Sequence, residues 1–182
     1  MAEFHPVHPL GDLDQLIADH SSSDAASAGI TLTVRADVSC AQLFASNGRH
    51  DDLAKTLKIG ASPAQVSQLD NLSVFPIAPG QWMISGSAPA DAMVSDLRNK
   101  VDGLGYVSQQ GDSRVCIRVS GPAARDLMAR GCRLDLHESV AGAGFCAQTN
   151  MAQIGVLVHQ IDDAPCYDLY VYSGFSRSFF DW

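Results

Sequence analysis

Long apolar runs are missing from this 182-residue sequence. The longest extends from Ile154 to Val158, whereas a helix needs about 20 apolar residues to cross a bilayer. Residues 1 to 8 also lack a basic segment followed by an apolar core, which is the pattern of a secretory signal. We therefore expect a cytoplasmic protein without a membrane-spanning helix.

Positive charge is scarce. The sequence has 12 Lys and Arg against 20 Asp and Glu, which gives a formal net charge of -8. Such a chain repels phosphate backbones and anionic lipids, so nucleic acid and membrane surfaces are excluded as expected partners. Hydrophobic residues make up 46% of the sequence and charged residues 18%, which is typical of a globular protein that folds without metals or disulfides.

Cysteine is too sparse for a disulfide framework. The five cysteines are an odd number, and each is separated from the next by more than ten residues, which also excludes a CxxC metal knuckle. We expect reduced thiols that are mostly packed in the core: Cys40, Cys116, Cys132, Cys146 and Cys166.

Familiar catalytic motifs are absent as well. The sequence contains no GxSxG and no Walker motif, and Gly142 to Ala147 matches GxGxxA without the preceding strand and following helix that dinucleotide binding requires. The only close pair of metal-ligand side chains is His5 with His8, which suggests adventitious metal at most. We therefore predict no catalytic, cofactor-binding or metal-binding residue in this chain.

The segment Leu134 to Glu138 leaves two interpretations open. A carboxylate on each side of His137 could tune the imidazole as a base. Alternatively, Leu134 and Leu136 point inward, so that Asp135 and His137 point outward to cap backbone groups or meet a neighbouring molecule. We favour the second, because His137 lacks a recognisable catalytic partner.

The N-terminal residues 1–28 differ from the rest of the chain. An extended opening from His5 to Pro9, one or two helical turns from Asp12 to Ala18 and a small-residue linker from Ser21 to Ser27 predict an arm that becomes ordered on a partner. Residues 29–182 are predicted to form one α+β domain, which could divide into lobes of about 29–103 and 104–182.

Residue periodicity predicts the elements of this domain. We expect caps at Ser87 and at Ser120 or Gly121, Gly131 as the C′ residue just beyond a helix, and core or interface positions for Trp82 and Trp182. Expected strands are residues 31–38, 72–75, 82–85, 105–109, 114–119, 151–160 and 167–172, with a turn at 76–80 and a hairpin across 110–112. Expected helices are residues 47–60, 90–101 and 122–130, and a last one with Phe175, Phe179 and Trp182 on one face.

The succession strand, strand, helix recurs three times along the chain. It predicts an α+β fold of antiparallel sheets with helices packed on one face, built from ferredoxin-like units.

The segment from Arg114 to His137 also carries a resemblance to a known family. Arg114 to Leu127 (RVCIRVSGPAARDL) and Gly131 to His137 (GCRLDLH) resemble the gamma subunit of heterotetrameric sarcosine oxidase, and the likeness continues to the terminal aromatic helix. Pro79 to Trp82 resembles a turn of the aminomethyltransferase-like superfamily. Residues 1 to 70 match weakly, and Glu138 stands where the family pattern has proline.

This resemblance implies part of the aminomethyltransferase folate-binding fold, used as a scaffold. In the family, the alpha subunit holds NAD and the tetrahydrofolate site, the beta subunit holds FAD and covalent FMN, and the delta subunit binds zinc. The complex oxidises sarcosine to glycine and hydrogen peroxide, and the methyl carbon leaves as formaldehyde or on tetrahydrofolate.

The expected role is thus a non-catalytic subunit of an oxidoreductase that acts on CH–NH donors, with alpha, beta and delta subunits as partners. Arg125, Asp135 and His137 are candidate subunit contacts. Two alternatives stay open: an equivalent subunit of an enzyme for dimethylglycine or N-methylglutamate, and a free-standing folate-dependent aminomethyltransferase-like enzyme.

Overall fold

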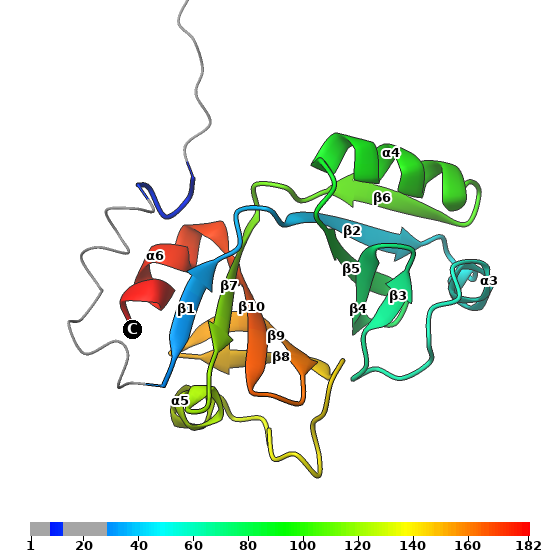
Figure 1. Ribbon diagram of the computed structural model, residues 1–182. Coiled ribbons are helices and arrows are strands. Elements are labelled where there is room, and N and C mark those ends of the chain that lie inside the picture. Colours follow the sequence, from blue (N-terminus) through cyan, green and yellow to red (C-terminus); the bar gives the residue numbers. More distant parts are fainter. Residues whose placement is uncertain (1–7, 13–28) are drawn as a thin grey trace, which may run out of the picture.

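The computed structural model describes residues 8–12 and 29–182. Within these residues the chain forms two five-stranded antiparallel sheets and four helices (Figure 1). Sheet A has the strand order β1-β7-β10-β9-β8, and sheet B has the order β3-β4-β5-β2-β6.

The strands of sheet A are β1 (Thr31–Val34), β7 (Arg114–Ser120), β10 (Cys166–Tyr172), β9 (Ile154–Asp162) and β8 (Cys146–Met151). The strands of sheet B are β3 (Ser67–Leu69), β4 (Leu72–Ala78), β5 (Gln81–Gly86), β2 (Ser39–Ala45) and β6 (Gly105–Gln109).

The helices lie on the outer faces of the two sheets. Helices α5 (Ala124–Gly131) and α6 (Ser173–Asp181) lie beside sheet A, and α3 (His50–Thr56) and α4 (Ala90–Lys100) lie beside sheet B (Figure 1). The predicted fold class, antiparallel sheets with helices packed on one face, is confirmed.

Alternation along each strand divides the apolar side chains among three cores. Val115, Ile117 and Val119 of β7 enter the core beneath α5 and α6, whereas Cys116 between them points to the opposite face. A second core lies between sheet B and its helices. The third core lies between the sheets and comprises Cys40, Phe75, Met83, Cys116, Cys146, Leu157 and Tyr170.

The predicted hairpin of residues 105–119 is wrong. β6 pairs with β2 in sheet B, and β7 pairs with β1 and β10 in sheet A, so residues 110–113 carry the chain from one sheet to the other. The strand expected over residues 31–38 is also split, because β1 ends at Val34 and β2 begins at Ser39 in sheet B. Alternation identifies a strand but does not show which sheet it joins.

Several predicted ends of elements are corrected. β4 continues to Ala78 through the expected turn, with an irregularity between Pro76 and Ala78. β8 was not predicted as a strand, β9 begins only at Ile154, and α3 is shorter than expected. The strand at residues 82–85, the hairpin of β9 and β10, and helix α4 are confirmed.

The predicted helix caps are wrong. α4 begins after Pro89 and α5 after Ala123, and neither N-terminus receives a side-chain hydrogen bond. Gly131 is the last residue of α5 rather than the residue beyond it. A Cβ atom at Gly131 would overlap the Trp182 ring, so a larger residue there would displace this ring, which is 55% exposed.

The aromatic face predicted for the last helix is only partly correct. Phe179 is buried, but Phe175 is 57% exposed and Trp182 is 55% exposed. Trp82 lies in the core of sheet B, as expected.

Most of the predicted N-terminal arm lies outside the described residues. Leu10, which is described, is buried in the core of sheet A. No helix among the described residues is long and apolar enough to cross a membrane.

Candidate functional site

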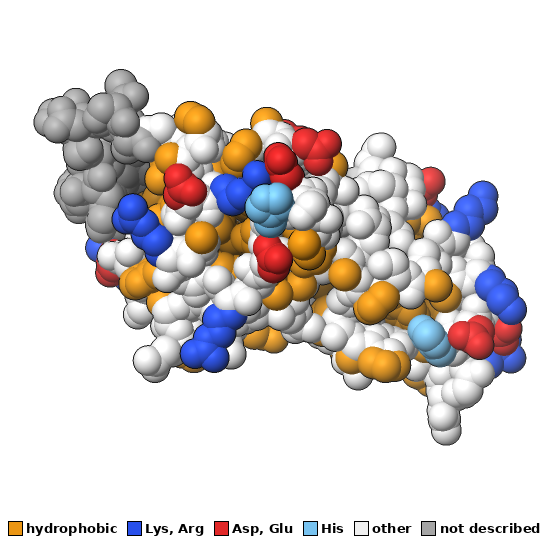
Figure 2. Space-filling model, turned by 90° about the horizontal axis from the view of Figure 1, so that it is seen from below, with side chains coloured by type: hydrophobic (Ala, Val, Ile, Leu, Met, Phe, Trp, Pro, Cys, Tyr) orange, Lys and Arg blue, Asp and Glu red, His pale blue; other side chains and the backbone are white. Residues whose placement is uncertain are grey.

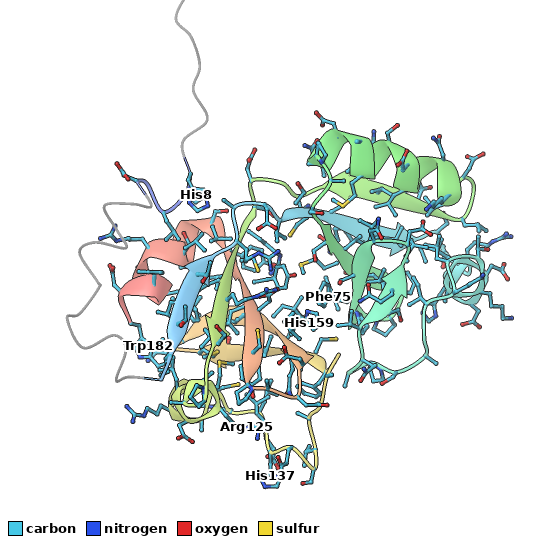
Figure 3. All side chains as sticks on the ribbon, in the orientation of Figure 1. His8, Phe75, Arg125, His137, His159 and Trp182 are labelled. Atoms are coloured by element: carbon cyan, nitrogen blue, oxygen red, sulfur yellow. The ribbon has the colours of Figure 1, made fainter. Side chains whose placement is uncertain are left out.

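The three candidate contact residues lie around the loop that follows α5. The Arg125 Nε donates a hydrogen bond to the Tyr167 hydroxyl at 3.4 Å, and its Nη1 lies 3.8 Å from Glu138 Oε2. Figure 3 shows His137 at the outer end of this loop, away from the sheets, with Arg125 between them. The structure therefore brings the predicted residues to one exposed part of the surface.

The loop is held by its own side chains. Asp135 Oδ1 accepts the backbone N–H of His137 at 3.0 Å, and His137 Nδ1 accepts the backbone N–H of Ser139 at 3.2 Å. Leu136 is buried while Asp135 and His137 are exposed. The interpretation that the two polar side chains point outward and cap backbone groups is confirmed.

The inner face of sheet A, which faces sheet B, carries a set of polar residues that sequence reasoning missed. Arg114 and Arg118 share this face with Cys116, because alternate residues of a strand point the same way. We define two rows across the sheet by its register. The 118 row comprises Arg118, Asp168, His159 and Cys146. The 114 row comprises two pairs, Arg114 with Tyr172 and Gly155 with Asn150, which meet one residue beyond the last β10–β9 pair, Val171 with Val156.

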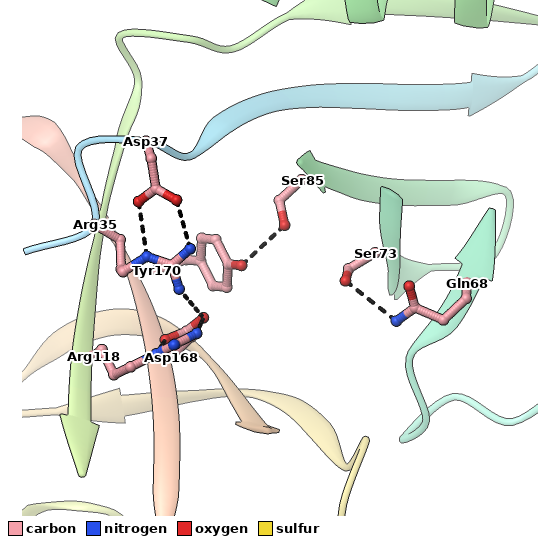
Figure 4. Close-up of polar contacts among 8 residues, drawn as sticks. All are labelled: Arg35, Asp37, Gln68, Ser73, Ser85, Arg118, Asp168 and Tyr170. Carbon is pink, nitrogen blue, oxygen red and sulfur yellow. Dashed lines mark hydrogen bonds and ion pairs between the residues drawn. The ribbon is translucent and has the colours of Figure 1, made fainter. Parts of the chain in front are cut away.

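Charges in the 118 row are closely paired (Figure 4). Arg118 donates from Nε and Nη2 to the two Asp168 oxygens at 2.7 and 2.8 Å, and Arg35 Nη1 lies 3.8 Å from Asp168 Oδ2. Arg35 also binds Asp37 through two hydrogen bonds, which lower the Asp37 pKa and raise the Arg35 pKa. The network joins β7 and β10 to the segment that leads from sheet A to sheet B.

His159 lies deeper in the same row. Its ring meets the Phe75 ring edge-on at a centroid distance of 5.1 Å (Figure 3), and its Nδ1 is buried without a hydrogen-bond partner in the described structure. Burial lowers the His159 pKa to about 4; Asp168 opposes that shift and Arg118 reinforces it. His159 is therefore neutral near pH 7 and holds no proton for acid catalysis.

Next to the 118 row, buried side chains of both sheets fill the space between them. Ser85 of sheet B and Tyr170 of sheet A share a buried hydrogen bond of 2.9 Å (Figure 4). Burial raises the pKa of both Cys40 and Cys146 to about 11. These thiols are therefore protonated and poorly nucleophilic near pH 7. All five cysteines are free and four are buried, as expected.

The 114 row is more open than the 118 row: Tyr172, Gly155 and Asn150 are exposed, and Arg114 is half-buried. Arg114 lies over the Tyr172 ring, 4.1 Å from its centroid, and its Nη2 donates to the Tyr172 hydroxyl at 3.0 Å. Gly155 contributes no side chain, and Tyr172 is 48% exposed. A hollow of about 250 Å³ lies beside these residues, and its wall includes Gln148 and Asn150.

A larger open groove of about 720 Å³ runs between α3 and β4. His50 stacks on Trp82 with ring centroids 5.4 Å apart at one end, and Lys55 and Lys58 lie at its border. Figure 2 shows that apolar side chains lie among charged ones on the face of the molecule seen from below. Over the described residues, no group of three or more His, Cys, Asp or Glu side chains is placed to hold a metal ion.

Comparison with known proteins gives structural matches only. No protein-family model and no curated protein matches the chain. One chain of the heterotetrameric sarcosine oxidase from Corynebacterium sp. U-96, solved in complex with pyrrole 2-carboxylate, matches with a TM-score of 0.80 and 21% identity. The match covers 97% of this chain and 92% of that chain.

This chain has the fold of that oxidase chain. The glycine cleavage system aminomethyltransferase T from Bartonella henselae also matches, with a TM-score of 0.62 and 14% identity over 97% of this chain. The match covers 49% of the aminomethyltransferase, so this chain spans about half of that enzyme's length. The predicted likeness to part of the aminomethyltransferase fold is confirmed at the level of fold.

Proposed function

We propose that this chain is the gamma subunit of a heterotetrameric sarcosine oxidase-type flavoenzyme and acts there as a structural, non-catalytic subunit. The observation that carries this proposal is the match over 97% of this chain and 92% of the oxidase chain. Because almost all of both chains is matched, the likeness extends to a whole chain of that complex. The resemblance of residues 114–137 to gamma subunits supports the same assignment.

In this proposal the complex oxidises the N-methyl group of sarcosine in the cytoplasm. The products are glycine, hydrogen peroxide, and either formaldehyde or a one-carbon unit on tetrahydrofolate. FAD, FMN, NAD, zinc and tetrahydrofolate bind to the alpha, beta and delta subunits, and this chain contributes none of those sites.

Purification of the tagged chain from its native cell tests the assignment. We expect a yellow complex with flavin absorbance that contains alpha, beta and delta subunits and forms hydrogen peroxide when sarcosine is added. A colourless, monodisperse monomer would contradict the proposal.

The substrate of the complex is tested on the same material. Related enzymes act on dimethylglycine or N-methylglutamate. Because the substrate site is expected on another subunit, the residues of this chain do not distinguish among these substrates. We expect the highest kcat/KM with sarcosine, whereas a preference for either of the other amines would transfer the assignment to that enzyme.

A free-standing aminomethyltransferase-like enzyme is the alternative from a different class, and the match to aminomethyltransferase T favours it. The chain spans only about half of that protein, which favours a scaffold instead. Titration of the isolated chain with tetrahydrofolate separates the two, and we expect no saturable binding.

The surface around Arg125, Asp135 and His137 is our proposed contact with another subunit. Arg125→Glu should lower recovery of the complex at least tenfold, because it places a negative charge beside Glu138 on this surface. Arg130→Glu on the same helix, without an ion pair in the described structure, is the matched control and should leave recovery unchanged. Thermal unfolding of both isolated variants would show whether Arg125→Glu acts on folding instead.

A further inference from the structure

The 114 row holds an arginine whose donors are mostly unused. The guanidinium group has five N–H donors, and among the described residues only Nη2 of Arg114 makes a hydrogen bond, to the Tyr172 hydroxyl. No carboxylate among the described residues lies within 4.0 Å of this group. Within residues 8–12 and 29–182, Arg114 is thus a cation without a paired anion.

The same strand shows what an arginine binds at the equivalent position of the other row. Arg118 lies opposite Asp168 in the β7–β10 register and forms two hydrogen bonds with its carboxylate. Four residues away on each strand, Arg114 lies opposite Tyr172. The Tyr172 side chain gives the Arg114 guanidinium a ring to stack on and one hydroxyl group that accepts a hydrogen bond. The other N–H groups of the guanidinium have no carboxylate to bind among the described residues.

The adjoining position of the row supplies the space. In the 118 row, the His159 side chain fills the place beside Asp168. In the 114 row this place belongs to Gly155, and a Cβ atom there would lie 3.9 Å from Asn150 Oδ1 and touch nothing closer. The resulting hollow of about 250 Å³ is just below the usual range for small-molecule pockets and suits a small anionic group.

The remaining polar groups suit a carboxylate. The amides of Asn150 and Gln148 border the hollow, and the Gln148 side chain is held by a hydrogen bond of 2.9 Å from its Nε2 to the Ile77 carbonyl. One guanidinium group with neutral amides balances a single negative charge, whereas a phosphate dianion usually takes more positive partners.

We propose that the 114 row of sheet A is a carboxylate-binding site, in which Arg114 binds a monoanionic carboxylate and the space above Gly155 receives the group that bears it. The carboxylate belongs either to a small molecule or to the C-terminus of a partner polypeptide. This inference concerns the chain itself and does not rest on the oxidase assignment.

The test follows the Arg114 Nε–H resonance of the full-length, 15N-labelled chain, assigned by its loss in Arg114→Lys. Propionate is titrated at constant ionic strength, with propionamide as the uncharged control, and acetyl-trialanine with a free C-terminus is compared with its amide. We expect a saturable shift with the carboxylates and none with the amides. Tenfold tighter binding of the peptide identifies a polypeptide terminus, and equal or tighter binding of propionate identifies a small molecule.

Two variants make the test specific. Gly155→Val fills the hollow without changing charge, and Arg114→Gln removes the cation; each should weaken binding at least tenfold. Arg130→Gln, an exposed arginine on α5, should bind as the unmodified chain does. The proposal is overturned by no saturable shift with either carboxylate, by unchanged affinity in both variants, or by tighter binding of inorganic phosphate than of propionate.

Discussion

Arg118 and Arg114 lie on the same face of the same strand, and their surroundings differ in every neighbour. Arg118 is paired with the buried Asp168, next to the filled position of His159. Arg114 stacks on the half-exposed Tyr172, next to the empty position of Gly155. The 118 row is therefore suited to holding the two sheets together, whereas the 114 row is suited to binding something from outside.

The largest expected difference comes from removing the carboxylate of the 118 row. Asp168→Asn leaves Arg118 and Arg35 without their shared anion, and it should lower the free energy of unfolding by about 3 kcal/mol. This value is at the lower end of the range for breaking a buried ion pair, because both arginines are partly exposed. Urea unfolding measures this. Asp70→Asn is the matched control, since its exposed pair with Lys100 should contribute less than about 1 kcal/mol. Equal losses in the two variants would show that the buried pair of the 118 row contributes no more than an exposed pair does.

The second effect is a pH dependence that arises from His159 in the 118 row. The pKa of His159 is about 4 in the folded chain and 6.5 in the unfolded chain. Between these pH values the imidazole is protonated in the unfolded state but not in the folded state. The free energy of unfolding is therefore not reduced by His159 above pH 6.5. It falls by a total of about 3 kcal/mol as the pH decreases to about 4.

His159→Leu should flatten this part of the stability curve, measured by urea unfolding at a series of pH values between 7 and 4. His8, whose pKa burial also lowers, is present in both proteins and cancels in the difference. Gly155→Val, in the other row, should keep the original slope. An unchanged slope in His159→Leu would show that the proton is taken up elsewhere.

The contrast between the rows could not be predicted from the sequence. Arg118 and Asp168 are 50 residues apart, and they meet only because β7 and β10 pair in one particular register. Shifting that register by one residue would move every side chain to the other face of the sheet. Alternation in Arg114 to Val119 correctly predicted a buried strand, but it did not tell which of its polar residues would meet a partner.

Local signals performed better where short-range chemistry determines the structure. The outward positions of Asp135 and His137 follow from alternation with Leu134 and Leu136, and the fold class follows from the succession of elements. The hairpin expected across residues 110–112 failed because the turn residues there serve a crossing between sheets. α5 does end at Gly131, but the contact that a side chain there would make, with the Trp182 ring, lies 51 residues away and leaves no local signal.

The third effect is smaller and belongs to the 114 row. Arg114→Gln removes the cation–π contact with Tyr172 but leaves no buried charge unpaired, so the free energy of unfolding should fall by only about 0.5 to 1 kcal/mol. Urea unfolding beside Asp168→Asn gives the comparison directly. A loss as large as that of Asp168→Asn would make Arg114 a structural residue and would weaken the case for a binding role.

The smallest effect is a gain. A glycine within a strand costs about 0.5 to 1 kcal/mol relative to alanine, because the unfolded chain has more freedom there. At Gly155 the backbone is extended, and a Cβ atom has space. Gly155→Val should therefore raise the free energy of unfolding by about 0.5 kcal/mol, and Gly155→Ala by a similar amount.

Gly105 is the control glycine, because a Cβ atom there would overlap the Phe44 carbonyl and Gly105→Ala should destabilise the protein. A stabilised Gly155→Val that no longer binds carboxylates would show that glycine is retained in the 114 row for the space it leaves and not for the fold.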